Sequence, residues 1–329
     1  MPSQTQWAAA KARQTMYAAL RAFFDSQGYL EIETPQLVPT PGMEVHIDPF
    51  ETHFLPQTDV GHARSLYLHT SPEYAMKRLL ADGSGPLFQI ARVFRNGEVS
   101  AHHNPEFTLL EFYRPNADYT AIMADLEQAL AAVETAVNPT GRMFSKTPYE
   151  RLTARDAVLR ETGIDIRVHS TFSSLKDAAE KAGIRVGGAS SFDDVFFHLF
   201  LQKVEGKLGL ERPTFLTEYP ASMAALAKLK DADPTVAERV ELYAQGVELG
   251  NGFSELTDSA EQRRRLLDEQ AQRRAQNRPA FALDEAFLAA LPMMPPSAGI
   301  AVGLDRVLML MTGRRTLAEV LLFPAQDFV

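Results

Sequence analysis

The segment from Arg92 to Phe107 gathers several groups that can bind a nucleotide. Arg95 carries a planar guanidinium that suits phosphate oxygens, and Phe107 offers a ring face on which a base can stack. Amide and imidazole groups lie between them, in the polar stretch 96–105. A surface hairpin with one core phenylalanine explains the same residues equally well, so this segment alone leaves both interpretations open.

A second candidate is the run Gly299–Arg306, in which small residues alternate along an expected strand before the chain enters a helix. Small side chains on one face of a strand leave the backbone open to close approach by a ligand. A glycine turn packed in the core is the more common meaning of so short a pattern.

A third candidate is the pair of carboxylates at Glu248 and Glu255. In a regular strand, residues seven apart face opposite sides, because the side-chain period is two. A bulge at Gly250–Gly252 would shift that period by one and bring both carboxylates to one face. Two convergent carboxylates beside phosphates suit Mg²⁺, whereas two solvated glutamates are the simpler alternative.

The elements around these segments predict an α+β fold, with a mainly antiparallel sheet flanked by helices. Apolar spacing and glycine or proline boundaries predict the following elements: a helix to Gln27, a strand at 29–33, a hairpin of 87–94 with 106–113, a helix-rich region at about 117–210, strands within 238–253, a charged helix at about 259–276, and a strand, turn and helix over 297–312.

Composition indicates a water-soluble globular protein: 45% of the residues are hydrophobic and 23% are charged. The net charge of -9, from 33 basic and 42 acidic residues, weighs against extensive nucleic-acid binding. The basic run around Arg263–Arg274 is interrupted by acidic residues and is typical of a solvated helix face. There is no cysteine, which excludes disulfides and thiolate chemistry. No targeting or membrane-spanning segment is evident, so we expect a cytoplasmic protein.

Taken in order, the three segments resemble motifs 2 and 3 of a class II aminoacyl-tRNA synthetase, with the acidic strand between them. The run Gly28–Leu37 resembles motif 1. Within that class the chain is similar to lysyl-tRNA synthetases from about residue 13 to 324. The matching segments are Ser71–Glu73, Met76–Leu80, His103–Thr108, Glu111–Tyr113 and Leu321–Pro324.

The resemblance implies a role for each residue at a motif position. Arg95 and Arg306 would be the catalytic pair, and Phe107 would stack on adenine. No side chain need act as a nucleophile, because the amino-acid carboxylate attacks the phosphate and the site supplies positioning and electrostatics. ATP would contact Arg95, Asn96, Gly97, His103, Asn104, Phe107, Glu248, Leu249, Gly303 and Arg306, the amino acid would contact Ser71, Pro72, Glu73, Glu111, Tyr113, Glu255 and Ala301, and Mg²⁺ would bind Glu248 and Glu255.

Three features differ from lysyl-tRNA synthetases. The sequence begins at the motif 1 helix, so we expect a single catalytic domain over residues 1–329 and no anticodon-binding domain. Ala301 occupies the middle glycine position of the lysine pocket. Motif 2 reads Arg95-Asn96-Gly97 in place of Arg-x-Glu, with Glu98 one position later, so either Glu98 or backbone groups would read the adenine amino group.

In the first two of these differences the chain resembles the elongation factor P lysyltransferases. The same resemblance is found in the runs Thr70–Arg78, Phe112–Pro115 and Tyr219–Ser222. The resemblance implies a Mg²⁺-dependent homodimer that makes (R)-β-lysyl-adenylate from ATP. It would transfer the β-lysyl group to an ε-amino group of elongation factor P, without stable tRNA or membrane binding. The alternatives are a lysyl-adenylate-forming or tRNA-charging enzyme, and a silent paralogue that only binds an amino acid or nucleotide.

Overall fold

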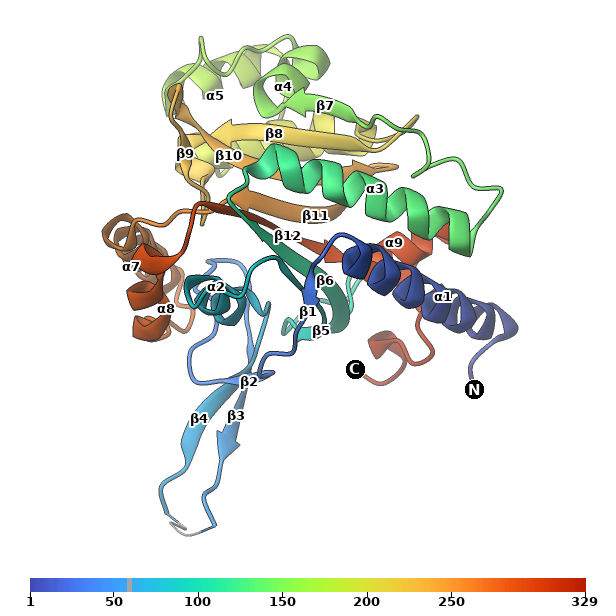
Figure 1. The fold of residues 1–329 in the computed structure, drawn as a ribbon. Helices are drawn as coiled ribbons and strands as arrows, with labels where there is room; N and C mark the ends of the chain where they lie inside the picture. Colours follow the sequence, from blue (N-terminus) through green and yellow to red (C-terminus); the bar gives the residue numbers. More distant parts are fainter. Residues whose placement is uncertain (58–60) are drawn as a thin grey trace.

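A large β-sheet crosses the middle of the molecule in the computed structural model, which describes residues 1–57 and 61–329 (Figure 1). Its strands are β1 (Leu30–Glu31), β5 (Leu87–Phe94), β6 (Glu106–Pro115), β7 (Glu150–Thr153), β8 (Thr214–Pro220), β9 (Leu229–Lys230), β10 (Asp233–Ala244), β11 (Val247–Ser254) and β12 (Ser297–Gly303). The order is β1-β5-β6-β12-β11-β10-β8-β7, and β9 pairs with β10. Among the strands that the structure describes, only β1/β5 and β7/β8 pair in parallel. The predicted α+β fold is therefore confirmed.

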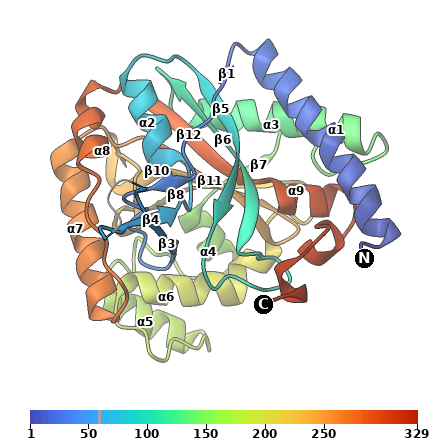
Figure 2. The same cartoon turned by 90° about the horizontal axis from the view of Figure 1, so that it is seen from below.

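Helices cover the sheet on several sides (Figure 1; Figure 2). α1 packs against α3, and α7 packs against α8 on the other side of the molecule. The helices are α1 (Gln4–Ser26), α2 (Glu73–Ala81), α3 (Tyr119–Val137), α4 (Ala154–Thr162), α5 (Phe172–Lys181), α6 (Phe192–Leu199), α7 (Ser259–Ala275), α8 (Glu285–Ala290) and α9 (Leu304–Met311). The described residues contain no helix that is both long and apolar enough to span a membrane.

The opening helix ends close to the predicted position. Ser3 forms a capping box with Gln6 at its start, which satisfies free N–H groups of the first turn. Phe24 on its buried face stacks on Phe88 of β5 at a centroid distance of 4.8 Å. Gly28 follows with a φ of +76°, a backbone conformation that favours glycine. The strand expected at 29–33 is shorter, at Leu30–Glu31.

The predicted hairpin is confirmed as β5 and β6, which pair antiparallel from Leu87↔Tyr113 to Phe94↔Glu106. This register places Glu111 opposite Gln89 and, on the other side, opposite Ala301 of β12. The polar loop 95–105 connects the two strands at the end where the cavity described below opens.

The strand and helix predicted over 297–312 are β12 and α9. The close approach that Gly299 permits is made by the Tyr113 ring, because a Cβ built at Gly299 would lie 2.2 Å from that ring. Gly299 therefore leaves room for the Tyr113 side chain of β6 to pack against the strand. Gly313 follows α9 with a φ of +66°, as expected for a helix-ending glycine.

The acidic strand β11 contains a bulge, although not at Gly250–Gly252. Tyr243 of β10 pairs with Glu248 while Leu242 pairs with Gly250, so Leu249 is the extra residue. Gly250 to Ser254 then pair regularly with β12. The predicted shift of side-chain period is confirmed, and its position is one residue earlier than expected.

The region 117–210 is mainly helical, but it also contains β7, and β8 follows it; neither strand was predicted. β7 pairs only with β8 at the edge of the sheet, so its four residues depend on tertiary contacts rather than on a strong local pattern. A second small sheet, of β2 (Leu37–Val38), β3 (Phe50–Phe54) and β4 (Arg64–Leu68), projects away from the body (Figure 1).

Candidate active site

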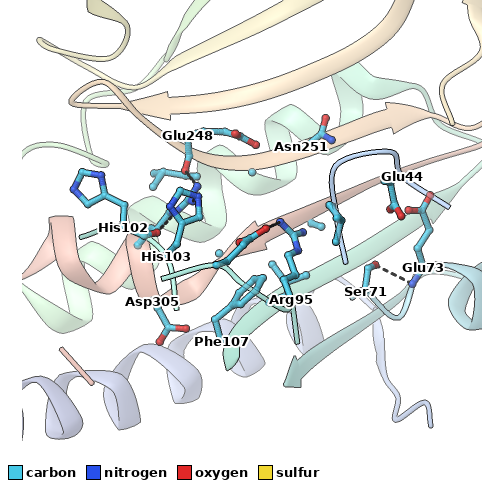
Figure 3. A pocket seen from close by; sticks show the side chains of 18 of the residues that line it. Glu44, Ser71, Glu73, Arg95, His102, His103, Phe107, Glu248, Asn251 and Asp305 are labelled. Carbon is cyan, nitrogen blue, oxygen red and sulfur yellow. Dashed lines mark hydrogen bonds and ion pairs between the residues drawn. The ribbon is translucent and has the colours of Figure 1, made fainter. Parts of the chain in front are cut away.

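One cavity opens beside the β5–β6 loop and gathers most of the residues that the sequence singled out (Figure 3). Its empty volume, the open mouth included, is about 1140 Å³. Strands β11 and β12, the start of α2 and the loop before β3 complete its wall. The predicted residues that line it are Ser71, Glu73, Arg95, His103, Asn104, Phe107, Glu248, Leu249, Ala301, Gly303 and Arg306.

Arg306, from the first turn of α9, is fixed by three contacts. Its Nε donates to the carbonyl oxygen of His102 at 3.0 Å, and its Nη1 donates to the carbonyl oxygen of Glu248 at 2.8 Å. Its Nη2 lies 2.8 Å from His103 Nε2. Burial, and then the positive charge of Arg306, lower the pKa of His103 below its ordinary value. A neutral His103 therefore accepts a hydrogen bond from Arg306 and holds it in place.

Arg95 lies over the face of Phe107, with 5.1 Å between its Cζ and the ring centroid. Its Nε is buried and has no hydrogen-bond partner. The nearest carboxylate is that of Glu98, 3.9 Å from Nη1, and Glu98 also lines the cavity. A guanidinium with a free buried donor can bind an anion at low cost, because it gains a partner that it now lacks.

Asn96 and Gly97 lie in the turn beside the cavity and do not line it. The Asn96 N–H donates to the carbonyl oxygen of Asp48 at 2.7 Å, which joins this turn to the loop before β3. Gly97 has a φ of +82°, a conformation that glycine adopts without strain. The turn therefore explains why glycine replaces glutamate at this position, and Glu98 is the carboxylate that reaches the cavity.

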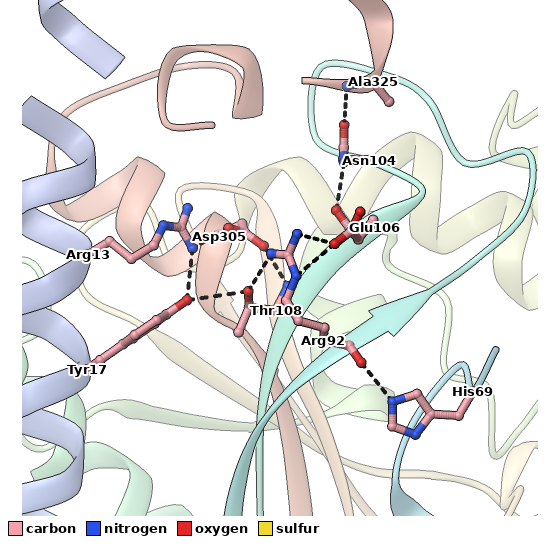
Figure 4. A network of polar contacts seen from close by, with 9 residues as sticks. All are labelled: Arg13, Tyr17, His69, Arg92, Asn104, Glu106, Thr108, Asp305 and Ala325. Atoms are coloured by element: carbon pink, nitrogen blue, oxygen red, sulfur yellow. Dashed lines mark hydrogen bonds and ion pairs between the residues drawn. The ribbon is translucent and has the colours of Figure 1, made fainter. Parts of the chain in front are cut away.

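Both polar atoms of the Asn104 side chain bind backbone groups of the protein (Figure 4). Its Nδ2 donates to the carbonyl oxygen of Glu106 at 2.6 Å, and its Oδ1 accepts from the N–H of Ala325 at 2.8 Å. These contacts tie the β5–β6 loop to the C-terminal segment. They give Asn104 a positioning role, and because it also lines the cavity, its contact with ATP stays a prediction.

The structure does not bring Glu248 and Glu255 together. Seven residues of extended chain separate them by roughly 20 Å, even with both on one face. The carboxylate of Glu255 contacts Lys77 instead, with 2.5 Å between Oε2 and Nζ. Burial raises the pKa of Glu248, and the next largest cause is the negative charge of Glu241 on β10. Glu241 rather than Glu255 is therefore the carboxylate that acts on Glu248, and the metal ligands stay a proposal.

Glu241 was missed in the sequence, although it lies seven residues before Glu248. Its oxygens accept hydrogen bonds from the hydroxyls of Tyr219 and Tyr243 and from Arg239. Carboxylate oxygens have further lone pairs that can bind a cation. Mg²⁺ is commonly held by one or two carboxylates together with substrate phosphates. The two neighbouring carboxylates fit that pattern, although the described residues contain no cluster of three or more metal-binding side chains.

A second group of predicted residues lies behind Ser71, beyond the cavity wall. Ser71 Oγ donates to Glu111 Oε2 at 2.8 Å, and the Tyr113 hydroxyl donates to Glu111 Oε1 at 2.7 Å. The Glu111 and Glu255 residues are only 1% and 3% exposed. Burial is the main cause that raises the pKa of both carboxyl groups. The contact of Glu111, Tyr113 and Glu255 with the amino acid stays a prediction, and a buried acidic group of this kind suits a substrate ammonium.

Lys77 of α2 neutralises part of this acidic group. Its Nζ lies 2.5 Å from Glu73 Oε1 and 2.5 Å from Glu255 Oε2. Burial alone would lower the pKa of Lys77, but the charges of Glu255 and Glu73 raise it above its ordinary value. Pro72, predicted as a substrate contact, starts α2 and lines a neighbouring cavity rather than this one.

Ala301 lines the cavity in the middle of a row that crosses the sheet. Its cross-strand neighbours are Glu111 on β6 and Asn251 on β11. Its methyl group therefore lies between the acidic group behind Ser71 and the strand that carries Glu248. The prediction that Ala301 shapes the amino-acid site stays a prediction, and this position is consistent with it.

Among the carboxylates that line the cavity, Glu44 and Glu269 lie outside every motif of the sequence analysis. No motif marks them, since each lies in a stretch of ordinary surface composition. Arg273 was interpreted as part of a solvated helix face, but its side chain is fully buried. It donates to the carbonyl oxygens of Glu44 and Ile47 at 2.7 and 2.9 Å and contacts Asp48 at 2.7 Å. Arg273 thus holds the loop that presents Glu44 to the cavity.

Comparison with known proteins agrees with this geometry. The family model described as tRNA synthetases class II (D, K and N) matches residues 3–327. A protein of Hamiltonella defensa named elongation factor P–(R)-beta-lysine ligase is 41% identical over 321 residues, which cover 95% of this chain and 94% of that protein. Proteins of the same name from Salmonella typhi and Edwardsiella ictaluri are each 40% identical, over 94% of this chain and 93% of theirs.

Both matches extend over nearly the whole chain, at an identity that leaves no doubt about common descent. The cavity residues described above lie within the matched range. The chain therefore belongs to the class II tRNA synthetases of the D, K and N group and, within them, to the family of elongation factor P–(R)-beta-lysine ligases.

Proposed function

We propose that this protein activates (R)-β-lysine with ATP as an adenylate and transfers the β-lysyl group to the ε-amino group of a lysine of elongation factor P. The observation that carries the proposal is the cavity itself. It is lined by two arginines, Arg95 and Arg306, and by several carboxylates, among them Glu44, Glu73, Glu248 and Glu269. The relatives named elongation factor P–(R)-beta-lysine ligase supply the identity of the amino acid and the acceptor.

The first step joins the amino acid to the α-phosphate. An oxygen of the amino-acid carboxylate forms a bond to the α-phosphorus, and the bond from that phosphorus to pyrophosphate breaks. Arg95, with its free Nε, would bind the α-phosphate, and Arg306 would bind the γ-phosphate. Arg306 is held by three contacts before substrate arrives, so it can stabilise the developing charge without reorganisation. Phe107 offers a ring for adenine.

Mg²⁺ would be held by Glu248 and Glu241 together with ATP phosphates. When bound, it neutralises phosphate charge and orients the triphosphate. Support for this pair comes from the adjoining carboxylates, whose mutual repulsion a cation relieves.

The second step transfers the acyl group. The ε-amino nitrogen of the acceptor lysine forms a bond to the adenylate carbonyl carbon, the bond to the phosphate oxygen breaks, and AMP leaves. The ammonium of the acceptor must first lose a proton to become a nucleophile. The open mouth of the cavity leaves a path for that side chain.

Further parts of the proposal rest on the family resemblance and on charge. We propose that residues 1–329 act as one catalytic domain, that the enzyme is a cytoplasmic homodimer, and that it forms no stable tRNA complex. The net charge of -9 supports the last point, because tRNA binding draws on basic surface.

The experiment is to incubate the protein with ATP, Mg²⁺, (R)-β-lysine and purified elongation factor P, and to measure the intact mass of the acceptor. We expect a gain of one lysyl residue on a single lysine. A parallel reaction with tRNA tests the alternative, and the proposal fails if tRNA is charged as efficiently as elongation factor P is modified. Absence of amino-acid-dependent ATP–pyrophosphate exchange would favour a silent binding paralogue instead.

A further inference from the structure

Three carboxylates from separate parts of the chain line one end of the cavity. Glu73 begins α2, Glu44 lies in the loop before β3, and Glu269 lies on α7. Figure 3 shows Glu44 and Glu73 together at the end away from His102, His103 and Glu248. Glu73 is a predicted substrate contact, whereas the other two lie outside every motif.

One oxygen of the Glu44 carboxylate is held in the cavity without a partner. Its Oε2 atom is buried and makes no hydrogen bond. A Cβ built at Gly42 would lie 2.2 Å from this oxygen, so the carboxylate occupies space that only glycine leaves free at position 42. An unpartnered buried carboxylate oxygen is costly unless a ligand supplies the missing donor.

Apart from Arg95, the nearby cations are already committed elsewhere. Lys77 pairs with Glu73 and Glu255, and Arg273 pairs with Asp48. Arg265 pairs with Glu261 and donates to backbone carbonyls. Among the residues that the structure describes, neither Glu44 nor Glu269 forms an ion pair. This end of the cavity therefore carries more negative than positive charge.

Burial and mutual repulsion act on both unpaired carboxyl groups. Burial raises the pKa of Glu44, and the charge of Glu73 raises it further. Burial raises the pKa of Glu269 to about 8, and Glu44 is the next cause. A bound ammonium would favour the ionised forms and offset the repulsion, since opposite charges at short range stabilise each other.

The position of this acidic end relates it to the reacting carboxylate. Arg95 and Glu44 line the same cavity, and the positive charge of Arg95 lowers the pKa of Glu44. The proposed function places Arg95 at the α-phosphate, where the carboxylate of the amino acid must also lie. An amino group close to that carboxylate would therefore be within reach of Glu44, while the distant amino group would face Glu111 and Tyr113 behind Ser71.

We propose that Glu44 and Glu269 join Glu73 in a subsite for the amino group nearest to the reacting carboxylate, and that Glu44 determines the preference for substrates that carry this group. In β-lysine it is the amino group on carbon 3. The inference rests on the proposed function and adds two residues to its substrate site. It also gives Gly42 a role, because a side chain there would displace the Glu44 carboxylate.

The test uses two competitors that each lack one amino group. 6-Aminohexanoate keeps only the distant amino group, and 3-aminohexanoate keeps only the near one. Inhibition of β-lysine-dependent ATP–pyrophosphate exchange is measured for the wild type and Glu44→Gln. We expect the KM for β-lysine and the inhibition constant of 3-aminohexanoate to rise by about 10- to 150-fold, the range for a lost hydrogen bond to a charged group. The constant for 6-aminohexanoate and the KM for ATP should stay unchanged.

Two further variants distinguish charge from structure. Gly42→Ala keeps the Glu44 carboxylate but displaces it. It should therefore weaken the binding of β-lysine and of 3-aminohexanoate and leave the binding of 6-aminohexanoate unchanged. Asp268→Asn removes an exposed charge next to Glu269 and should change none of these constants. The inference is overturned if the KM for β-lysine is unchanged in Glu44→Gln. It is also overturned if the inhibition constants of both competitors rise equally.

The outcome for the wild type separates this inference from the proposed function. If the wild type catalyses ATP–pyrophosphate exchange with β-lysine, the proposed function is supported regardless of the result for Glu44→Gln. No exchange with any lysine-type amino acid in the wild type would overturn the proposed function, and the subsite inference with it.

Discussion

Lys77 Nζ lies 2.5 Å from Glu255 Oε2, and both side chains are only 1% exposed. A buried charge that loses its partner is expensive, because the remaining ion has neither water nor a counter-ion. We expect Lys77→Met to lower the free energy of unfolding by about 3–5 kcal/mol. Urea denaturation followed by circular dichroism measures it.

The double variant Lys77→Met, Glu255→Gln is the control for this pair. It removes the unpaired charge together with its partner, so it should be more stable than Lys77→Met alone. A double variant that is less stable than the single one would show that packing around Lys77, rather than charge, dominates.

His103 makes ATP binding sensitive to acid. Burial and then Arg306 lower its pKa below the ordinary value of 6.5. The neutral ring accepts from Arg306, so this contact is present above the lowered pKa and is lost as the pH falls through it, below 6.5. We expect the KM for ATP to rise on acidification from about pH 8 to about pH 5.

The matched variant is His103→Gln, which keeps a hydrogen-bond acceptor that does not titrate in this range. Its KM for ATP should vary less with pH than that of the wild type, while the KM for the amino acid serves as the reference. An equally steep acid rise in the variant would assign the titration to another group.

If Glu248 and Glu241 hold Mg²⁺, substitution of Glu248, Glu241 and Glu255 should have different effects on the Mg²⁺ requirement. Glu248→Gln and Glu241→Gln should raise the Mg²⁺ concentration for half-maximal ATP–pyrophosphate exchange by roughly 10- to 100-fold. Glu255→Gln should leave this concentration unchanged and raise the KM for the amino acid, because its carboxylate lies with Lys77 behind the cavity wall. Titration of exchange activity with Mg²⁺ measures both effects.

The sequence analysis assigns Mg²⁺ to Glu248 and Glu255, which predicts similar changes in the Mg²⁺ requirement for loss of either carboxylate. Equal shifts in the Mg²⁺ requirement of Glu248→Gln and Glu255→Gln would restore that interpretation. They would require the two carboxylates to approach one another when substrates bind.

Ala301 should contribute to the choice between lysine isomers. A methyl-sized change in a pocket discriminates by about 1–3 kcal/mol, or roughly 10- to 200-fold. We expect Ala301→Gly to raise kcat/KM for α-lysine relative to β-lysine within that range. Adenylate formation with each isomer measures the ratio. If the ratio is unchanged and both isomers lose activity alike, Ala301 only packs against its neighbours.

The sequence by itself determined the elements whose signals are local. The helix that ends before Gly28, the β5–β6 hairpin and the strand–helix unit at 297–311 each carry their own apolar period and their own boundary residues. The motif residues Arg95 and Arg306 were found the same way, since their neighbours in the chain identify them. The amino-acid composition also determined the net negative charge of the protein.

Only the tertiary structure decided which distant groups meet. Glu44 and Glu269 have no local signal, and they reach the cavity because buried Arg273 holds the loop of Glu44 against α7. The side-chain period of a strand predicts which face a residue occupies, but not which residue of the neighbouring strand lies beside it. For this reason the sequence analysis pairs Glu248 with Glu255 on the same strand instead of with Glu241 on the neighbouring strand. Pairing across strands is set by packing of the whole sheet, and a stretch of sequence carries no record of its partner.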